Sequence, residues 1–289
     1  MGLAAALGAL GLLTACGGAS GEVSPVTSAA VAASSAPPSA PPTAPPASTT
    51  VPQATTVPPT TVPPTTSTTA APAVLQRLVL GHSVEGREIQ AVERGARGGR
   101  VVLVIGCIHG DEAAGAAVAD DLTTVPVPAG IDLWVVPTMN PDGEAHGTRT
   151  NAHEVDLNRN FPYRWAPLGQ PGDSQYAGTA AASEPETKAV VDLIERIKPE
   201  LTIWYHQDLN RIAPAKGRAG RIRQRYADLT GLPVLPVTGG TYTGTASPWA
   251  QTKVNGVAFI VELGPTLGDE QALTHARAVL TVAGELGSV

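Results

Sequence analysis

The pattern of apolar residues after residue 100 predicts a sheet flanked by helices. Four runs are largely apolar and rich in β-branched residues, as strands buried on both faces are: 101–106, 131–136, 201–205 and 256–261. Stretches with helical periodicity lie between and after them, at 111–123, 184–198, about 218–230 and 269–286. Residues 77–94 have the pattern of a hairpin that turns at Glu85-Gly86. Strands that alternate with helices indicate an α/β domain with a largely parallel sheet.

One helix has a clear start signal. In Ser183-Glu184-Pro185-Glu186, Ser183 can cap the helix and Glu186, three residues later, can reach back to it. Pro185 fits the first turn, where its missing N–H costs nothing. We therefore expect a capping box at this position.

The first quarter of the chain has the composition of a tether. Only Glu22 is charged before Arg77, all aromatic residues lie between Trp134 and Phe259, and residues 23–72 are mostly Pro, Thr, Ser, Ala and Val. Such a segment cannot bury enough apolar surface to offset its ordering entropy. We expect residues 17–74 to form an unfolded spacer, of which the roughly 50 residues from 23 to 72 could reach on the order of 150 Å if extended as polyproline II. We expect residues 75–289 to form one folded domain.

Residues 1–16 have the features of an export signal. An apolar run at 3–15 is too short to span a bilayer and ends in Leu13-Thr14-Ala15-Cys16, which resembles a bacterial lipobox. This resemblance implies that Cys16 is lipidated. The alternative is a signal cleaved elsewhere, with an incidental cysteine. No Lys or Arg precedes Cys16, which suggests a translation start upstream of Met1 or otherwise different from it.

Charge and cysteine content narrow the function classes. The net charge is −6 with no basic tract, which argues against a nucleic-acid binder. No apolar run reaches the roughly 18 residues of a spanning helix. The chain has two cysteines, and an acylated Cys16 would leave Cys107 without a partner, so the exported domain would depend on its core alone.

Polar clusters follow the predicted strands, where ligands bind in sheets of this kind. His109 and Glu112 follow the first of the four runs, His206 ends the third, and Glu262 ends the fourth. Two histidines and one glutamate form a common catalytic zinc set, which leaves one position for water. A further carboxylate outside the metal shell would be the base that activates this water.

Six motifs along the chain resemble those of the zinc carboxypeptidase (M14) family, in the family's order. They are His109-x-x-Glu112, Asn140-Pro141-Asp142-Gly143, Val155-Asp156-Leu157-Asn158-Arg159-Asn160-Phe161-Pro162, Ser183-Glu184-Pro185-Glu186, His206 and Val261-Glu262-Leu263. The compact size and Gly147-Thr148-Arg149-x-Asn151 are most similar to the bacterial murein peptide amidase branch. The resemblance implies a three-layer α/β/α sandwich around a mixed, largely parallel eight-stranded sheet.

The resemblance also implies a role for each site residue. His109, Glu112 and His206 would bind one zinc ion, and Asp156 would bond the outer nitrogen of His109. Glu262 would be the general base and then the acid for the leaving amine. Arg149 would stabilise the oxyanion. Asn158 and Arg159 would hold a substrate carboxylate.

Other candidate residues are weaker. Tyr242 could be the family's mobile tyrosine or plain packing. Cys107 is expected to be a small buried residue. We expect His82, His146, His153 and His275 to be solvent or loop histidines. Ser183 has no base beside it in sequence, which disfavours a serine hydrolase.

Three alternatives to a murein peptide amidase stay open. They are a general metallocarboxypeptidase, a related deacylase of N-acyl amino acids, and a non-catalytic envelope lipoprotein that keeps the fold for binding. The complete set of predicted ligands and base favours an enzyme. The expected partners are a peptide or muropeptide and, through the lipid anchor only, the membrane. We expect a monomer on the outer face of the cytoplasmic membrane that reaches into the cell wall.

Overall fold

A computed structural model describes residues 74–237, 242–253 and 256–287 of the chain. Its sheet has the strand order β1-β2-β4-β3-β5-β7-β6. The strands are β1 (Val74–His82), β2 (Glu88–Gly95), β3 (Arg100–Ile105), β4 (Ile131–Val136), β5 (Leu201–Gln207), β6 (Arg211–Ile212) and β7 (Val257–Leu263). The expected signal at 1–16 and most of the expected tether at 17–74 lie outside the described residues.

The sheet is mixed, with a parallel centre and antiparallel edges. β4, β3, β5 and β7 are parallel neighbours, whereas β1–β2, β2–β4 and β6–β7 pair antiparallel. The four apolar runs of the sequence form the parallel centre, and the expected hairpin forms β1 and β2. The family resemblance implied eight strands, but the described residues contain seven, and β6 is only two residues long.

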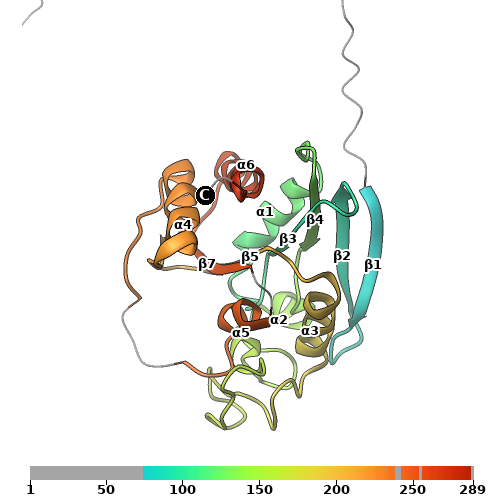
Figure 1. The fold of residues 1–289 in the computed structure, drawn as a ribbon. Helices are drawn as coiled ribbons and strands as arrows, with labels where there is room; N and C mark the ends of the chain where they lie inside the picture. Colours follow the sequence, from blue (N-terminus) through green and yellow to red (C-terminus); the bar gives the residue numbers. More distant parts are fainter. Residues whose placement is uncertain (1–73, 238–241, 254–255, 288–289) are drawn as a thin grey trace, which may run out of the picture. The chain divides into compact units, whose positions relative to one another are not determined.

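Helices cover both faces of the sheet, which confirms the α/β/α sandwich (Figure 1). One core cluster joins the sheet to α1 (Ala114–Leu122), α4 (Gly217–Thr230) and α6 (Asp269–Glu285). The other joins it to α3 (Pro185–Ile197) and α5 (Ala246–Lys253). A short helix α2 (Pro141–His146) and a single 3₁₀ turn η1 (Leu157–Arg159) lie in the connection between β4 and α3.

Alternation along β5 decides which face each side chain reaches. Trp204 belongs to the core under α3 and α5, and Tyr205 belongs to the core under α1, α4 and α6. His206, one residue further, returns to the face of Trp204. The end of one strand therefore supplies polar groups to both faces of the sheet.

The start of α3 corrects one prediction. Pro185 is its first residue, as expected, but Glu184 is the N-cap residue and makes no side-chain capping bond, and Ser183 donates to Glu184 Oε1 instead. Glu186 is fully buried and accepts from Asn151 Nδ2 (3.0 Å) and from the backbone N–H of Val84 (3.1 Å). The prediction of a capping box is wrong, because Glu186 instead binds Asn151, in the loop between α2 and η1, and Val84, in the turn between β1 and β2.

Among the described residues, none of the helices combines the length and the hydropathy that a membrane crossing requires.

Candidate active site

The first two candidate ligands lie on the turn between β3 and α1. This turn passes so close to α2 that a Cβ atom on Gly110 would lie 1.8 Å from the carbonyl carbon of Gly143. Glycine is therefore required where the His109 motif meets the Asn140-Pro141-Asp142-Gly143 motif. The contact fixes His109 and Glu112 against the segment that leads to Arg149.

His109, Glu112 and His206 converge, with one ligand atom of each within 4.8 Å of the others. His109 Nδ1 lies 2.9 Å from Glu112 Oε1, and His206 Nδ1 lies 2.8 Å from Glu112 Oε2. The two histidines are buried, at 1% and 5% exposure. Imidazole nitrogens with a carboxylate match the donor set of catalytic zinc, so these residues fit the metal that the sequence predicts.

Asp156 orients the first histidine. Its Oδ1 accepts from His109 Nε2 at 3.1 Å, which leaves Nδ1 turned toward Glu112 and His206. Burial would raise the pKa of Asp156, but the bond from His109 and the nearby charges lower it to about 2. A buried carboxylate of this kind fixes the ring orientation and makes it a better metal ligand.

Arg149 lies at the edge of the metal triad. Its Nε and Nη2 donate to Asp156 Oδ2 at 3.1 and 2.9 Å, and its Nη1 lies 3.1 Å from His109 Nδ1 and 3.0 Å from Glu112 Oε1. Asp156 therefore holds both a candidate ligand and the nearby guanidinium. The side chain of Arg149 is 27% exposed, so it also faces the open site.

Glu262 enters the site from β7, beside His206 in the parallel register of β5 and β7. Burial, followed by the charge of Glu112, raises its pKa to about 7. In contrast, hydrogen bonds from His109 and His206 outweigh the effect of burial on Glu112 and lower the pKa of that carboxyl. The two carboxylates thus have different environments, as ligand and base roles require.

Asn158 and Arg159 lie on η1 and line the same cavity as the metal triad. Asn158 Nδ2 lies 3.4 Å from His206 Nε2, and its Oδ1 accepts from the backbone of Ala246 at 3.0 Å. Arg159 is 6% exposed and donates to Asn158 O (2.8 Å) and Gln175 Oε1 (3.3 Å). Its Nε has no hydrogen-bond partner among the described residues.

The cavity has a volume of about 660 Å³ and one apolar side. Tyr242 is 42% exposed, lines the cavity and stacks under Arg159, with the guanidinium carbon 4.6 Å from the ring centre. Leu209 and Val237 also line it and are about half exposed, at 46% and 48%. All the residues predicted for catalysis and substrate binding are brought together here.

Gln207 is a site residue that the sequence analysis missed. Its backbone N–H donates to Glu112 Oε2 (3.2 Å), and its Oε1 accepts from Ala114 N at the start of α1 (2.9 Å). Its Nε2 donates to Gly264 O (3.0 Å), two residues after Glu262. One side chain thus joins the segments that follow the candidate ligand and the candidate base. Its only sequence signal is its place directly after His206.

Two residues outside the site were also assigned from sequence. Cys107 is buried, donates to His109 O at 3.0 Å, and has its pKa raised to about 12 by burial, as suits a packing residue. The prediction that His275 is a solvent or loop histidine is wrong. It is 5% exposed on α6 and bonds Tyr226 Oη at 2.8 Å. Polar residues near it in sequence, such as Gln271 and Arg277, are exposed on α6, so the local sequence did not indicate that His275 is buried.

The chain belongs to the zinc carboxypeptidase family, whose model matches residues 66–212. The match contains all three candidate ligands, whereas Glu262 lies after it. Family membership and the convergent triad establish a zinc-dependent hydrolase of the carboxypeptidase and amidase type.

Curated relatives include murein peptide amidases. Murein peptide amidase A of Escherichia coli K12 is 31% identical over 188 residues, which cover 61% of this chain and 76% of the relative. Murein peptide amidase A of Vibrio campbellii is 35% identical over 130 residues, which cover 41% of this chain and 50% of the relative. Human carboxypeptidase B is 29% identical over 176 residues, which cover 49% of this chain and 42% of the relative.

Solved structures share the fold. The murein-tripeptide amidase MpaA of Escherichia coli O157 superposes with a TM-score of 0.58 at 25% identity, covering 74% of this chain and 93% of that one. Carboxypeptidase A of Helicoverpa armigera superposes with a TM-score of 0.66 at 19% identity, covering 74% of this chain and 69% of that one.

Proposed function

We propose that this enzyme hydrolyses an amide bond in cell-wall peptides, between D-glutamate and a diamino acid. The observation that carries the proposal is a buried arginine, Arg159, in the same cavity as the metal triad and Glu262. Such a cavity suits a peptide whose free carboxylate lies near the cleaved bond. Among peptides of this kind, those of murein are favoured by the similarity to murein peptide amidases.

Glu262 is the proton carrier of the proposed reaction. His109, Glu112 and His206 would hold the zinc ion, which would supply a Lewis acid for the attacking water and for the carbonyl group. The carboxylate of Glu262 accepts the proton of the attacking water and passes it to the amine that leaves. Its raised pKa, about 7, suits both steps near neutral pH.

Arg149 is placed to stabilise the charge that develops on the carbonyl oxygen. Its guanidinium is held by two bonds to Asp156 Oδ2 and lies within 3.1 Å of two candidate ligand atoms. A donor fixed before the reaction costs no reorganisation when the oxyanion forms. Asp156 therefore supports the triad and the oxyanion site together.

Arg159 is the proposed carboxylate grip. Burial lowers its pKa, although a guanidinium stays charged, and a buried cation favours an anionic ligand. Within the described residues its Nη2 makes a single bond, to Gln175 Oε1 at 3.3 Å, which leaves donor capacity for a substrate carboxylate. Asn158 supports this position through its backbone oxygen, and Tyr242 covers the guanidinium on one face.

The cavity does not favour a dedicated carboxypeptidase for basic residues. Its acidic lining residues are Glu112 and Glu262, which have roles as ligand and base. The rest of the wall includes Thr245, Pro248 and Ile260, which are uncharged. A general carboxypeptidase remains the second candidate, because Arg159 could hold the C-terminus of any peptide.

We also propose that the enzyme is exported and anchored through Cys16. The apolar run before this cysteine, the Leu13-Thr14-Ala15-Cys16 sequence and the Pro/Thr-rich segment after it support this location. The domain would then act outside the cytoplasmic membrane, within reach of the cell wall, as a monomer.

The substrate proposal is tested by direct competition. The metal-loaded enzyme is given equal amounts of a murein tripeptide and of a plain peptide with a free L-residue C-terminus, and the products are identified by mass. We expect faster cleavage of the murein peptide at the D-glutamyl bond. Faster trimming of the plain peptide would reject the amidase assignment and leave the carboxypeptidase. Loss of both activities in Glu262→Gln shows that the same site acts on both.

A further inference from the structure

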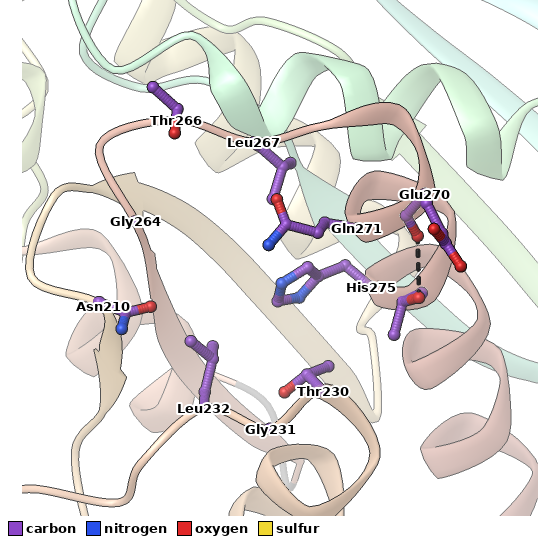
Figure 2. Close-up of a pocket in the computed structure, with 11 residues that line it drawn as sticks. Asn210, Thr230, Gly231, Leu232, Gly264, Thr266, Leu267, Glu270, Gln271 and His275 are labelled. Atoms are coloured by element: carbon purple, nitrogen blue, oxygen red, sulfur yellow. Dashed lines mark hydrogen bonds between the residues drawn. The ribbon is translucent and has the colours of Figure 1, made fainter. Parts of the chain in front are cut away.

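A second cavity, of about 400 Å³, lies between the end of α4 and the start of α6 (Figure 2). It is bounded by the last residues of α4, the segment after β7 and the first turns of α6. Its wall contains Gly264, two residues beyond Glu262, and none of the residues assigned to hydrolysis. The proposed function therefore does not explain it.

His275 points into this cavity from α6 (Figure 2). The side chain is 5% exposed, and its Nδ1 lies 2.8 Å from Tyr226 Oη. Its Nε2 has no hydrogen-bond partner among the residues that the structure describes. Because this atom faces the cavity, it is available to a ligand that enters there.

The proton on His275 can be assigned from the tyrosines behind it. Tyr205 and Tyr226 are fully buried, and their hydroxyls lie 2.7 Å apart. Tyr205 Oη has Tyr226 as its one hydrogen-bond partner in the described part of the chain, so its proton must go to Tyr226 Oη. Tyr226 then donates to His275 Nδ1, and the neutral ring carries its proton on Nε2.

The cavity therefore receives an N–H donor from His275. Gln271 adds a second donor, because its Oε1 accepts from Gly268 N (3.0 Å) and its Nε2 makes no hydrogen bond to any residue that the structure describes. Asn210 stands across the space with an amide of its own (Figure 2). Two donors and a further amide suit a ligand that carries both a carbonyl oxygen and an N–H.

The described lining residues offer little to a charged ligand. Among them there is no lysine or arginine to pair with an anion, and the one acidic residue, Glu270, points away from the His275 ring (Figure 2). Leu232 and Leu267 supply apolar surface. Burial also lowers the pKa of His275 to about 4, so the ring is a neutral donor at physiological pH.

We propose that this cavity is a second binding site, for an uncharged amide ligand whose carbonyl oxygen accepts from His275 Nε2–H and whose small apolar group contacts Leu232 and Leu267. An acetamido group has this chemistry. It could come from an N-acetylated sugar or from an acetylated peptide.

The test observes the His275 ring directly. The full chain with ¹⁵N-labelled histidine is titrated with N-acetylglucosamine, with N-acetylalanine N′-methylamide and, as a charged comparison, with glucosamine. Fragments of this size bind with dissociation constants on the order of 1 mM. We expect at least one of the acetylated probes to shift the His275 Nε2 signal, and glucosamine to leave it unchanged. A response to only one acetylated probe identifies the source of the group.

Three variants make the result specific. Leu232→Trp narrows the cavity, keeps the His275 residue and should weaken binding by about tenfold or more. Leu235→Trp, at a 47% exposed leucine outside the cavity, should bind as the parent does. His275→Phe identifies which ¹⁵N signal belongs to His275, and it should not bind the acetylated probes. If this variant does not fold, the binding of Leu232→Trp tests the proposal. The proposal is overturned if neither acetylated probe shifts His275, if glucosamine binds equally well, or if Leu232→Trp binds normally. None of these readouts depends on hydrolysis.

Discussion

His206 and Glu262 occupy the same register position on the neighbouring parallel strands β5 and β7. Side chains at paired positions of adjacent strands point to the same face of the sheet. The sheet therefore places a candidate zinc ligand beside the candidate base before any loop contributes. The other site residues, Arg149, Asn158 and Arg159, come from the connection between β4 and α3 and approach this pair.

Replacing Glu262 should stop turnover and leave the metal site intact. Glu262→Gln keeps the shape of the side chain but cannot accept a proton from water. Since a positioned general base contributes about 10²–10⁴-fold, kcat should fall by at least that factor. Zinc content and the midpoint of thermal unfolding should match the parent. Near-normal turnover would refute the mechanism.

The pH dependence of the parent enzyme follows from the same residue. Protonated Glu262 cannot act as a base, so kcat/KM should rise with pH as the carboxyl ionises. Burial and the charge of Glu112 raise its pKa to about 7. A bound dication lowers the pKa of a nearby carboxyl, so the rise should be centred at or below about pH 7. A rise that is centred well above pH 7 would contradict this assignment.

Removing the side chain of Gln207 should loosen the metal site. Gln207→Ala loses the bonds to Ala114 N and Gly264 O, which join the segments after Glu112 and Glu262. Residues that orient metal ligands typically contribute about 10–100-fold to metal affinity or activity. We expect a loss of this size in zinc affinity, measured by competition with a chelator. Gln90→Ala, at an exposed glutamine on β2, is the control. An unchanged zinc affinity would show that Gln207 does not support the site.

The positions of the candidate ligands could be predicted because they follow strongly patterned strands. His206 and Glu262 end apolar runs, and parallel strands bring their carboxyl ends to one edge. The contacts of Gln207 could not be predicted, because they depend on how the turn after β3 packs against the end of β5. His275 was assigned wrongly for a similar reason. Its burial depends on Tyr226 of α4, 49 residues away in sequence.

His275 should make the fold less stable in weak acid. The unfolded chain protonates this histidine near pH 6.5, but burial lowers its pKa in the folded chain to about 4. Protonation therefore favours unfolding, and the free energy of unfolding should fall as the pH drops from about 6.5 to about 4. This group contributes at most about 1.4 kcal/mol per pH unit. Urea denaturation should show a weaker loss of stability between pH 7 and pH 5 in His275→Gln than in the parent. His82→Gln, at an exposed histidine, should behave as the parent does; an equal loss in all three proteins would contradict the prediction.

The anchor proposal makes a prediction about location. Cys16→Ala removes the residue proposed to be lipidated, so the enzyme should move from the membrane fraction to the soluble exported fraction. Cys107→Ala removes the other cysteine, which is buried in the folded domain, and should stay with the membrane. Immunoblots of the separated fractions measure both. A Cys16→Ala variant that fractionates like the parent would disprove the anchor.

The role of Arg159 can be separated from a general structural role by changing the substrate as well as the enzyme. If its guanidinium binds a substrate carboxylate, the parent should prefer a peptide with a free carboxylate over the same peptide with that group amidated. Hydrogen bonds to charged groups contribute about 1.5–3 kcal/mol, which corresponds to a preference of roughly 10–100-fold in kcat/KM. In Arg159→Ala the preference should disappear. The kcat/KM for the carboxylate substrate should fall, and the kcat/KM for the amidated substrate should change little. Arg164→Ala, at an exposed arginine outside the cavity, should keep the full preference. Equal losses for both substrates in Arg159→Ala would show that this residue supports the cavity without binding the carboxylate.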